Sequence, residues 1–161
     1  MYNVGERYEE GEVMKKVIIL RGVPGSGKSR YACEAATGVD PTRICSADQY
    51  FEQGGRYYFN PLKLPEAHNF SFGRFLDALL DSYPLIVVDN TNSHHWEYEN
   101  YEKAARLVGY EVEIIEFRAS TVAEIRLCFD RNQHGVPRDI IAKMAVDMER
   151  DDRAKIIPVI S

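Results

Sequence analysis

Short apolar runs alternate with segments of helical periodicity along most of the chain. The runs have the length and composition of strands, and they lie at residues 16–20, 43–46, 85–89, 111–117 and 156–160. Strands that alternate with helices predict an α/β protein in which a mostly parallel sheet lies between two helical layers, a three-layer αβα fold. Pro158 predicts that the last run is an edge strand, because proline lacks the N–H that a central strand donates.

The helical segments have recognisable starts and stops. Helical spacing of apolar residues predicts helices at about 30–36, 65–81 and 93–108, and a last helix that begins at Pro137. Thr121-x-x-Glu124 predicts a capping box at the start of another helix. Residues 48–52 predict a helical turn that Gly54-Gly55 stops, and an irregular aromatic stretch follows at residues 57–61.

The connection between the first strand and the first helix carries the clearest chemical signal. Residues 22–29 read Gly-Val-Pro-Gly-Ser-Gly-Lys-Ser and match the phosphate-binding pattern G-x-x-x-x-G-K-[ST] in full. Its glycines allow positive φ and bring backbone N–H groups onto phosphate oxygens, Lys28 adds a positive charge, and Ser29 can join the shell of Mg²⁺. We therefore expect ATP and Mg²⁺ as cofactors, with ATP held by Gly22, Pro24, Gly25, Ser26, Gly27, Lys28 and Ser29.

Length and composition predict one soluble domain. The chain has 161 residues, 45% hydrophobic and 28% charged, and no apolar run long enough to span a membrane. Acidic residues crowd the first 14 positions, so we expect a flexible N-terminal arm at 1–14 and a single domain at 15–161. Cys33, Cys45 and Cys128 lack metal-site spacing and are expected to be buried free thiols of a cytoplasmic protein.

The net charge limits the class of partner. A formal charge of −5 is unlike that of a protein that tracks a long polynucleotide, because such binding depends on many phosphate contacts. A short nucleic-acid end or a small molecule is compatible with an acidic protein that has a local basic patch. No membrane partner is expected, and the sequence does not indicate an oligomeric state.

Polar residues follow the second and third apolar runs, where a parallel sheet places its ligands. Asp48 could accept the proton of an acceptor hydroxyl or could cap the following turn. Asp89 ends the most apolar run, where a carboxylate would hold Mg²⁺ or its water ligands. Thr91 and Asn92 could bind an acceptor or merely satisfy the turn.

Arginines flank a glycine- and proline-containing connection between the last two helices. This arrangement, at about residues 121–138, suits a helical lid that closes on a triphosphate and offsets the charge of the transition state. Arg131 is the candidate, because it ends its helix beside the connection. His134 is interpreted as a turn or packing residue.

Taken together, these motifs resemble the polynucleotide-kinase branch of P-loop kinases. The chain is especially similar to the small ATPase domain of an animal ubiquitin-ligase-binding protein and to its phage and microbial relatives. The resemblance covers about residues 16–150 and rests on five motifs in order, which are 22–29, 46–51, 58–68, 88–92 and 131–137.

The resemblance implies a P-loop NTPase fold and transfer of the γ-phosphate of ATP to a 5′-hydroxyl of DNA or RNA. Lys28, Asp48 as the general base and Arg131 would be catalytic, and Arg131 would also contact the phosphates of ATP. Ser29 and Asp89 would serve Mg²⁺. The acceptor would be bound by Asp48, Asp89, Thr91 and Asn92.

One departure concerns the acceptor. Phage-type kinases carry an arginine three positions after the base, where this chain has Phe51. Arg43, Arg56, Lys63 and Arg74 could supply the missing charge. Phe51 and the aromatic residues 57–59 could stack a base or pack beneath the loop. Alternatives are therefore a kinase acting on a nucleotide, nucleotide sugar or antibiotic, and a non-catalytic ATP-binding module.

Overall fold

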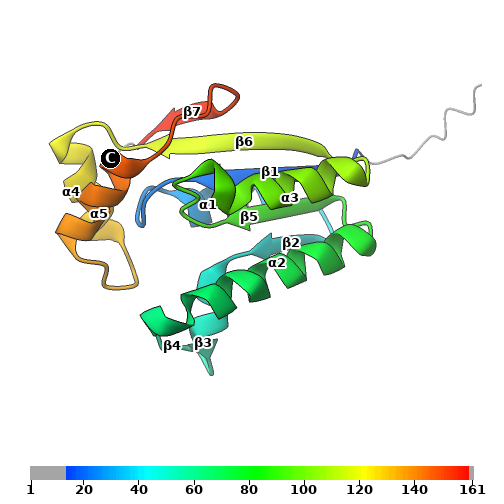
Figure 1. Cartoon of the computed structure of the whole chain (residues 1–161), viewed down its shortest axis with the longest axis horizontal. Helices are drawn as coiled ribbons and strands as arrows, with labels where there is room; N and C mark the ends of the chain where they lie inside the picture. Colours follow the sequence, from blue (N-terminus) through cyan, green and yellow to red (C-terminus); the bar gives the residue numbers. More distant parts are fainter. Residues whose placement is uncertain (1–13, 160–161) are drawn as a thin grey trace, which may run out of the picture.

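The central sheet is parallel throughout and has five strands. The computed structural model describes residues 14–159, so the predicted N-terminal arm lies almost wholly outside the described residues. The strands are β1 (Lys16–Arg21), β2 (Thr42–Cys45), β5 (Leu85–Asp89), β6 (Glu111–Arg118) and β7 (Lys155–Pro158). Their order is β2-β5-β1-β6-β7, which confirms the predicted parallel sheet and places the proline-containing β7 at an edge (Figure 1).

Helices cover both faces of this sheet, as predicted. On one face, Ala32 of α1 (Lys28–Ala36) packs against Ile18 and Val87. On the other face, α2 (Leu64–Leu80) and α3 (His95–Leu107) supply Phe75 and Tyr101, which pack against the strand residues facing that side. The alternation of side chains along β1 explains this division, because neighbouring positions of a strand point to opposite faces.

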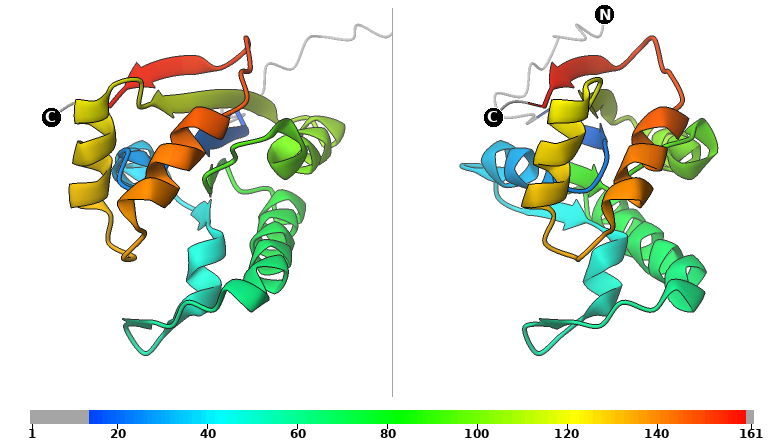
Figure 2. Two further views of the ribbon diagram at one scale, coloured as in Figure 1. Left: turned by 60° about the vertical axis from the view of Figure 1, so that its left-hand side comes forward. Right: turned by 90° about the vertical axis from the view of Figure 1, so that its left-hand side faces the viewer.

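A helical hairpin stands at the carboxyl ends of the strands (Figure 2). It consists of α4 (Val122–Arg131) and α5 (Arg138–Asp147), and the predicted Thr121–Glu124 capping box is present at its start. The hairpin is attached to the body of the protein by a small cluster of buried residues, namely Val23, Cys128, Ile141 and Val159. The segment expected to form a lid, at about 121–138, comprises α4 and the connection to α5.

A smaller unit extends from the β2 edge of the sheet. The 3-10 helix η1 (Ala47–Phe51) follows β2, and a two-stranded hairpin comes next, made of β3 (Glu52–Gln53) and β4 (Arg56–Tyr57). A short 3-10 helix, η2 (Pro61–Lys63), then leads into α2. The sequence analysis missed this hairpin: Gly54 and Gly55, with φ of 56° and 79°, form its two-residue turn besides ending the helical turn.

Several details differ from expectation. Cys45 and Cys128 are buried as predicted, but Cys33 is exposed, because it follows the sheet-facing Ala32 by one residue and therefore points away from the sheet. The helix expected at 93–108 begins at His95, because His94 is an extended N-cap residue that forms a capping box with Glu97. Among residues 14–159, no helix has the length and apolarity needed to cross a membrane.

Candidate active site

The phosphate loop joins β1 to α1 in a conformation that requires its glycines. Gly25 and Gly27 have φ of 77° and 110°, values that side-chain-bearing residues rarely adopt. A Cβ on Gly25 would lie 2.0 Å from the carbonyl oxygen of Cys128, so α4 packs directly on the loop. The buried hydroxyl of Ser26 has no hydrogen-bond partner within residues 14–159, which fits a loop built to receive a polar ligand.

Lys28, Ser29 and Asp89 meet at the carboxyl ends of β1 and β5. Lys28 Nζ donates a hydrogen bond to the carbonyl oxygen of Val23 at 3.1 Å. Burial lowers the pKa of Lys28, and the negative charges of Asp89 and Asp48 oppose this shift. Ser29 Oγ donates to Asp89 Oδ2 at 2.8 Å.

These oxygens suit Mg²⁺ better than a transition metal. Mg²⁺ keeps several waters and takes only one or two protein carboxylates, and Ser29 and Asp89 offer one hydroxyl and one carboxylate side by side. The described residues contain no group of three or more His, Cys, Asp or Glu side chains that could bind a metal as a dedicated cage. The site therefore fits a metal that arrives with its nucleotide.

Asp48 lies in η1 just beyond β2, with its carboxylate 47% exposed. Ser46, not Asp48, caps η1: its hydroxyl accepts a hydrogen bond from the backbone N–H of Asp48 at 3.2 Å. The capping role considered for Asp48 is therefore filled by Ser46. The carboxylate instead receives the hydroxyl of Tyr57 on Oδ1 at 2.8 Å, and Nε2 of His134 lies 3.5 Å from Oδ2.

The β5–α3 connection contributes mainly structural hydrogen bonds. The carbonyl oxygen of Thr91 accepts the N–H of Gly22 at 3.0 Å, and Asn90 Oδ1 accepts the N–H of Ala47 at 2.8 Å. Asn92 is 2% exposed and its side-chain amide donates to the carbonyl oxygen of Leu20 at 2.7 Å. The half-buried side chain of Thr91 is thus more accessible to an acceptor than that of Asn92.

Arginines of the α4–α5 hairpin remain available for a ligand. Arg131 ends α4, and Arg126 and Arg138 lie on the two helices. Within the part of the chain that the structure describes, none of these three side chains forms a hydrogen bond or an ion pair. They can therefore respond to a triphosphate without breaking an existing contact.

A buried arginine that the sequence analysis did not single out lies at the carboxyl ends of the strands, where it joins several segments of the chain. Arg21, at the end of β1, is fully buried and pairs with Glu116 of β6 at 3.2 Å. Its guanidinium also donates to three backbone carbonyls, those of Asn92 (2.9 Å), Ser93 (3.0 Å) and Glu149 (2.6 Å). The sequence signal was an arginine directly after an apolar strand, which is unusual for a position facing a core.

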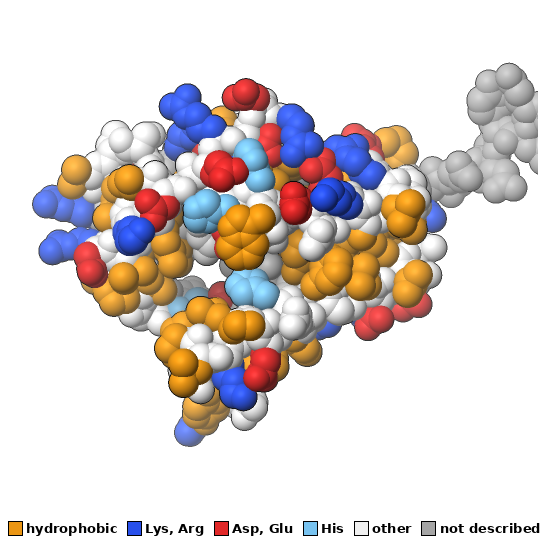
Figure 3. Space-filling model, viewed as in Figure 1, with side chains coloured by type: hydrophobic (Ala, Val, Ile, Leu, Met, Phe, Trp, Pro, Cys, Tyr) orange, Lys and Arg blue, Asp and Glu red, His pale blue; other side chains and the backbone are white. Residues whose placement is uncertain are grey.

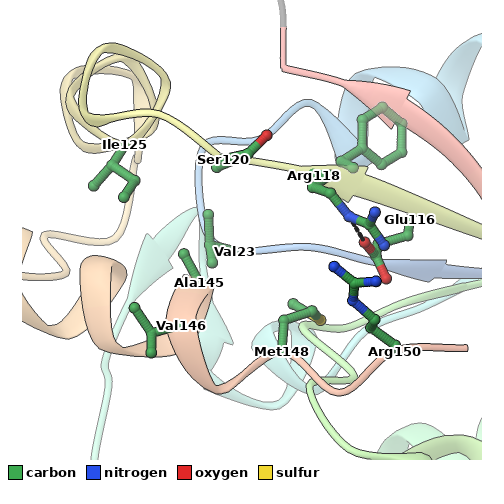
Figure 4. A pocket seen from close by; sticks show the side chains of 11 residues that line it. Val23, Glu116, Arg118, Ser120, Ile125, Ala145, Val146, Met148 and Arg150 are labelled. Carbon is green, nitrogen blue, oxygen red and sulfur yellow. Dashed lines mark hydrogen bonds and ion pairs between the residues drawn. The ribbon is translucent and has the colours of Figure 1, made fainter.

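A pocket of about 330 Å³ lies between the helical hairpin and the sheet (Figure 4). Ile125, Ala145 and Val146 line it from α4 and α5, whereas β6 supplies Glu116 and Arg118, which form an ion pair. The hairpin thus rests on the body through few buried side chains and leaves space beside them.

The acceptor side has a hollow of its own. Figure 3 shows it between the α4–α5 hairpin and the lobe that carries β3–β4 and the start of α2, with histidine side chains at its margin. In that lobe a second pocket of about 240 Å³ is lined by aromatic, amide and lysine side chains, namely Tyr50, Phe51, Gln53, Tyr58, Asn60 and Lys63. Phe51 itself is 4% exposed and packs with Ala47 and Ala67, so it acts chiefly as a core residue of the lobe.

The parallel sheet, the phosphate loop after β1, the Ser29–Asp89 pair and the helical hairpin define a P-loop kinase-like protein. Such a fold binds the nucleotide on its phosphate loop. The chain belongs to the AAA domain family, whose family model matches residues 17–150. The resemblance noted from the sequence is therefore confirmed at the level of the family.

The chain is similar to parts of much longer curated proteins. The chain is 32% identical over 150 residues to human NEDD4-binding protein 2, a match that covers 89% of this chain and 8% of that protein. The curated relatives of this kind are far longer, and the chain spans less than a tenth of NEDD4-binding protein 2 and of human YLP motif-containing protein 1.

Solved structures share the fold at low identity. A chain of the Pnkp1/Rnl/Hen1 RNA repair complex has a TM-score of 0.66 at 19% identity, covering 87% of this chain and 46% of that one. A gluconokinase from Sinorhizobium meliloti has a TM-score of 0.61 at 15% identity, covering 92% and 85%. At these identities the likeness establishes the fold alone.

Proposed function

We propose that this chain transfers the γ-phosphate of ATP to the 5′-hydroxyl of a nucleic-acid end. The observation that carries the proposal is the convergence of Lys28, Asp89 and Asp48. The two carboxylates both act on the buried ammonium of Lys28, which links the phosphate side and the base side of one site. The Asp48 carboxylate is half-exposed and does not cap η1, so it could accept a proton from an acceptor hydroxyl as a general base.

On the nucleotide side, residues 22–29 would cradle the triphosphate and Lys28 would contact its β- and γ-phosphates. Ser29 and Asp89 would hold Mg²⁺, which when bound neutralises charge on the phosphates. Arg131 would approach the γ-phosphate from the lid, where a mobile cation offsets the charge that develops during transfer.

On the acceptor side, Asp48 would take the proton of the 5′-hydroxyl. The bond between that oxygen and the γ-phosphorus forms, the bond from the γ-phosphorus to its bridging oxygen breaks, and the electron pair leaves with ADP. Thr91 and the edge of the hollow would contact the acceptor, and the proposed role of Asn92 would be to shape its turn. Tyr58, which is more than half exposed, would stack a base.

The likeness to a chain of an RNA repair complex supports a nucleic-acid acceptor, as does the aromatic pocket that Tyr50 and Tyr58 line in the lobe after β2. Of the four cations considered as replacements for the family arginine, Arg43 of β2 donates to the carbonyl oxygen of Arg74 in α2, and Arg74 donates to the carbonyl oxygen of Ile44 in β2. Lys63 pairs with Glu66. Arg56 makes no side-chain hydrogen bond or ion pair with residues 14–159 and is the remaining candidate for an acceptor phosphate.

A small-molecule kinase is the second candidate, and the burial of Phe51 favours it. This position cannot contact an acceptor phosphate as the family arginine does, and the chain carries a net charge of −5. The gluconokinase and a tunicamycin resistance protein from Deinococcus radiodurans, with a TM-score of 0.58 at 12% identity, share the fold.

The test is a transfer assay with γ-labelled ATP and Mg²⁺. Acceptors are 5′-hydroxyl DNA and RNA oligomers of increasing length, offered beside nucleosides, nucleotides and sugars. Labelling of oligomers is expected to disappear in Lys28→Ala and Asp48→Asn and to persist in Asp77→Asn, a matched change of an exposed aspartate on α2. Label on a small molecule alone, with no dependence on oligomer length, would refute the nucleic-acid assignment and support the second candidate.

A further inference from the structure

The tip of the α4–α5 hairpin reaches the acceptor-side lobe through His134. Its Nε2 lies 3.5 Å from Asp48 Oδ2, and its ring centroid lies 4.1 Å from that of Tyr57, with 35° between the ring planes. The lid and the candidate base are 86 positions apart in sequence, yet one imidazole touches the base and its hydrogen-bond partner.

Tyr57 holds the other oxygen of the same carboxylate. Its hydroxyl donates to Asp48 Oδ1 at 2.8 Å, and aromatic contacts with Phe51 and Phe59 at centroid distances of 6.0 and 6.2 Å fix the ring. Burial and the hydrogen bond to Asp48 raise the pKa of Tyr57, so its hydroxyl remains a donor at neutral pH. The two oxygens of Asp48 thus face polar groups from two different segments, the hydroxyl of Tyr57 in β4 and Nε2 of His134 in the α4–α5 connection.

We propose that His134 is a positioning residue that orients the Asp48 carboxylate when the α4–α5 hairpin closes on the triphosphate. The inference rests on the proposed function, because it assigns Asp48 the role of base. A distance of 3.5 Å is long for a hydrogen bond, and contacts of this kind commonly tighten once substrates are bound.

The position of Arg131 would couple ATP binding to the orientation of Asp48. Arg131 and His134 lie three residues apart at the same end of the hairpin, so one movement brings a cation to the phosphates and a donor to the base. A carboxylate can accept about four hydrogen bonds, so two donors leave room for the acceptor hydroxyl. The base would then be fully oriented only while ATP is held, which would limit proton abstraction from an acceptor in its absence.

The first test separates positioning from binding. His134→Ala is expected to lower kcat by about tenfold to a hundredfold while the KM for ATP changes by less than about threefold, because a misplaced group slows chemistry more than binding. His134→Gln retains an N–H donor and should recover part of the loss. His95→Ala is the matched control, since His95 is also half-exposed beside a carboxylate, that of Glu149 at 2.6 Å, and should alter kcat by less than about twofold.

The second test does not depend on the acceptor. Amide hydrogen exchange of residues 132–136 is measured with β,γ-imido-ATP bound, and it should be faster in His134→Ala than in the wild type or in His95→Ala. Normal transfer with an unchanged kcat in His134→Ala would overturn the inference and leave the proposed function intact. Absence of transfer by the wild type to any acceptor would refute the proposed function, and with it the role of His134 toward a base, whatever the exchange rates.

Discussion

Gly25 is the point where the phosphate loop and α4 approach most closely, and replacing it by alanine tests whether that contact holds the lid. Its φ is +77°, and the added Cβ would lie 2.0 Å from the carbonyl oxygen and 2.8 Å from the carbonyl carbon of Cys128. Both atoms belong to the backbone of α4, so no side-chain rotation relieves the overlap. Gly38 offers a matched control, with a φ of +78° and nothing within 4 Å of a Cβ.

The magnitude follows from two separate contributions. A left-handed conformation costs an L-residue about 1–2 kcal/mol, offset in part by the about 0.4–1 kcal/mol that alanine contributes by restricting the unfolded chain. Both variants share this first contribution, so Gly38→Ala is expected to lose between about 0 and 1.6 kcal/mol. Only Gly25→Ala must also displace α4, and overpacking of this kind typically costs about 1–3 kcal/mol.

Urea denaturation of the two variants and the wild type measures the difference in the free energy of unfolding. We expect Gly25→Ala to be less stable than Gly38→Ala by about 1–3 kcal/mol, with weaker ATP binding in the first variant alone. Equal losses in the two variants would refute the reasoning, because they would mean that α4 yields to the new methyl group without resistance.

Two further predictions concern buried charges. Arg21→Met should lower the free energy of unfolding by about 3 kcal/mol, the low end for a broken buried pair, because Glu116 keeps its second partner Arg118; a loss in urea denaturation below about 1 kcal/mol would contradict this. Hydrogen bonding to Arg153 lowers the pKa of Asp151, so its stabilisation is present above the ordinary aspartate pKa and is lost as the pH falls below about 4. Asp151→Asn should therefore cost about 1.5–3 kcal/mol at pH 7 and progressively less between pH 4 and pH 2, and a gap that stays constant over this range in denaturation curves would oppose the assignment.

The strands of the sheet were predictable because each contains a short run of apolar residues. The run 85–89 has the same bounds in the sequence analysis and in the structure, since all five of its residues are buried and Pro84 precedes it. The hairpin β3–β4 left no comparable signal. Its strands have two residues each, and Glu52, Gln53 and Arg56 are exposed, so no apolar alternation marks it.

In the candidate site, too, residues fixed by a motif or a strand end were predictable, and contacts between distant segments were not. Lys28, Ser29 and Asp89 could be found because a motif or a strand end fixes their positions, and parallel strands bring such ends to one edge. The contacts of Tyr57 and His134 with Asp48 could not be found in this way. They depend on how the β3–β4 hairpin and the α4–α5 connection fold toward η1. The sequence left open whether Asp48 caps the helical turn, and the structure shows that Ser46, two residues earlier, is the cap.

Arg21 fixes the root of the α4–α5 hairpin to the carboxyl end of β1, whereas the tip of the hairpin lies away from this group. Its guanidinium ties the end of β1 to the carbonyl oxygens of Asn92, in the β5–α3 connection, and Glu149, just beyond α5. The strand ends and the root of the hairpin are thereby joined through one buried group, and such fixed frames keep reacting groups in register. At the other end of the hairpin, Arg131 has no partner within residues 14–159 and Gly135 adopts a φ of 68° in the connection. Closure on a triphosphate should therefore bend the tip at residues 132–137 and leave the root in place, which is the movement that would carry His134 onto Asp48.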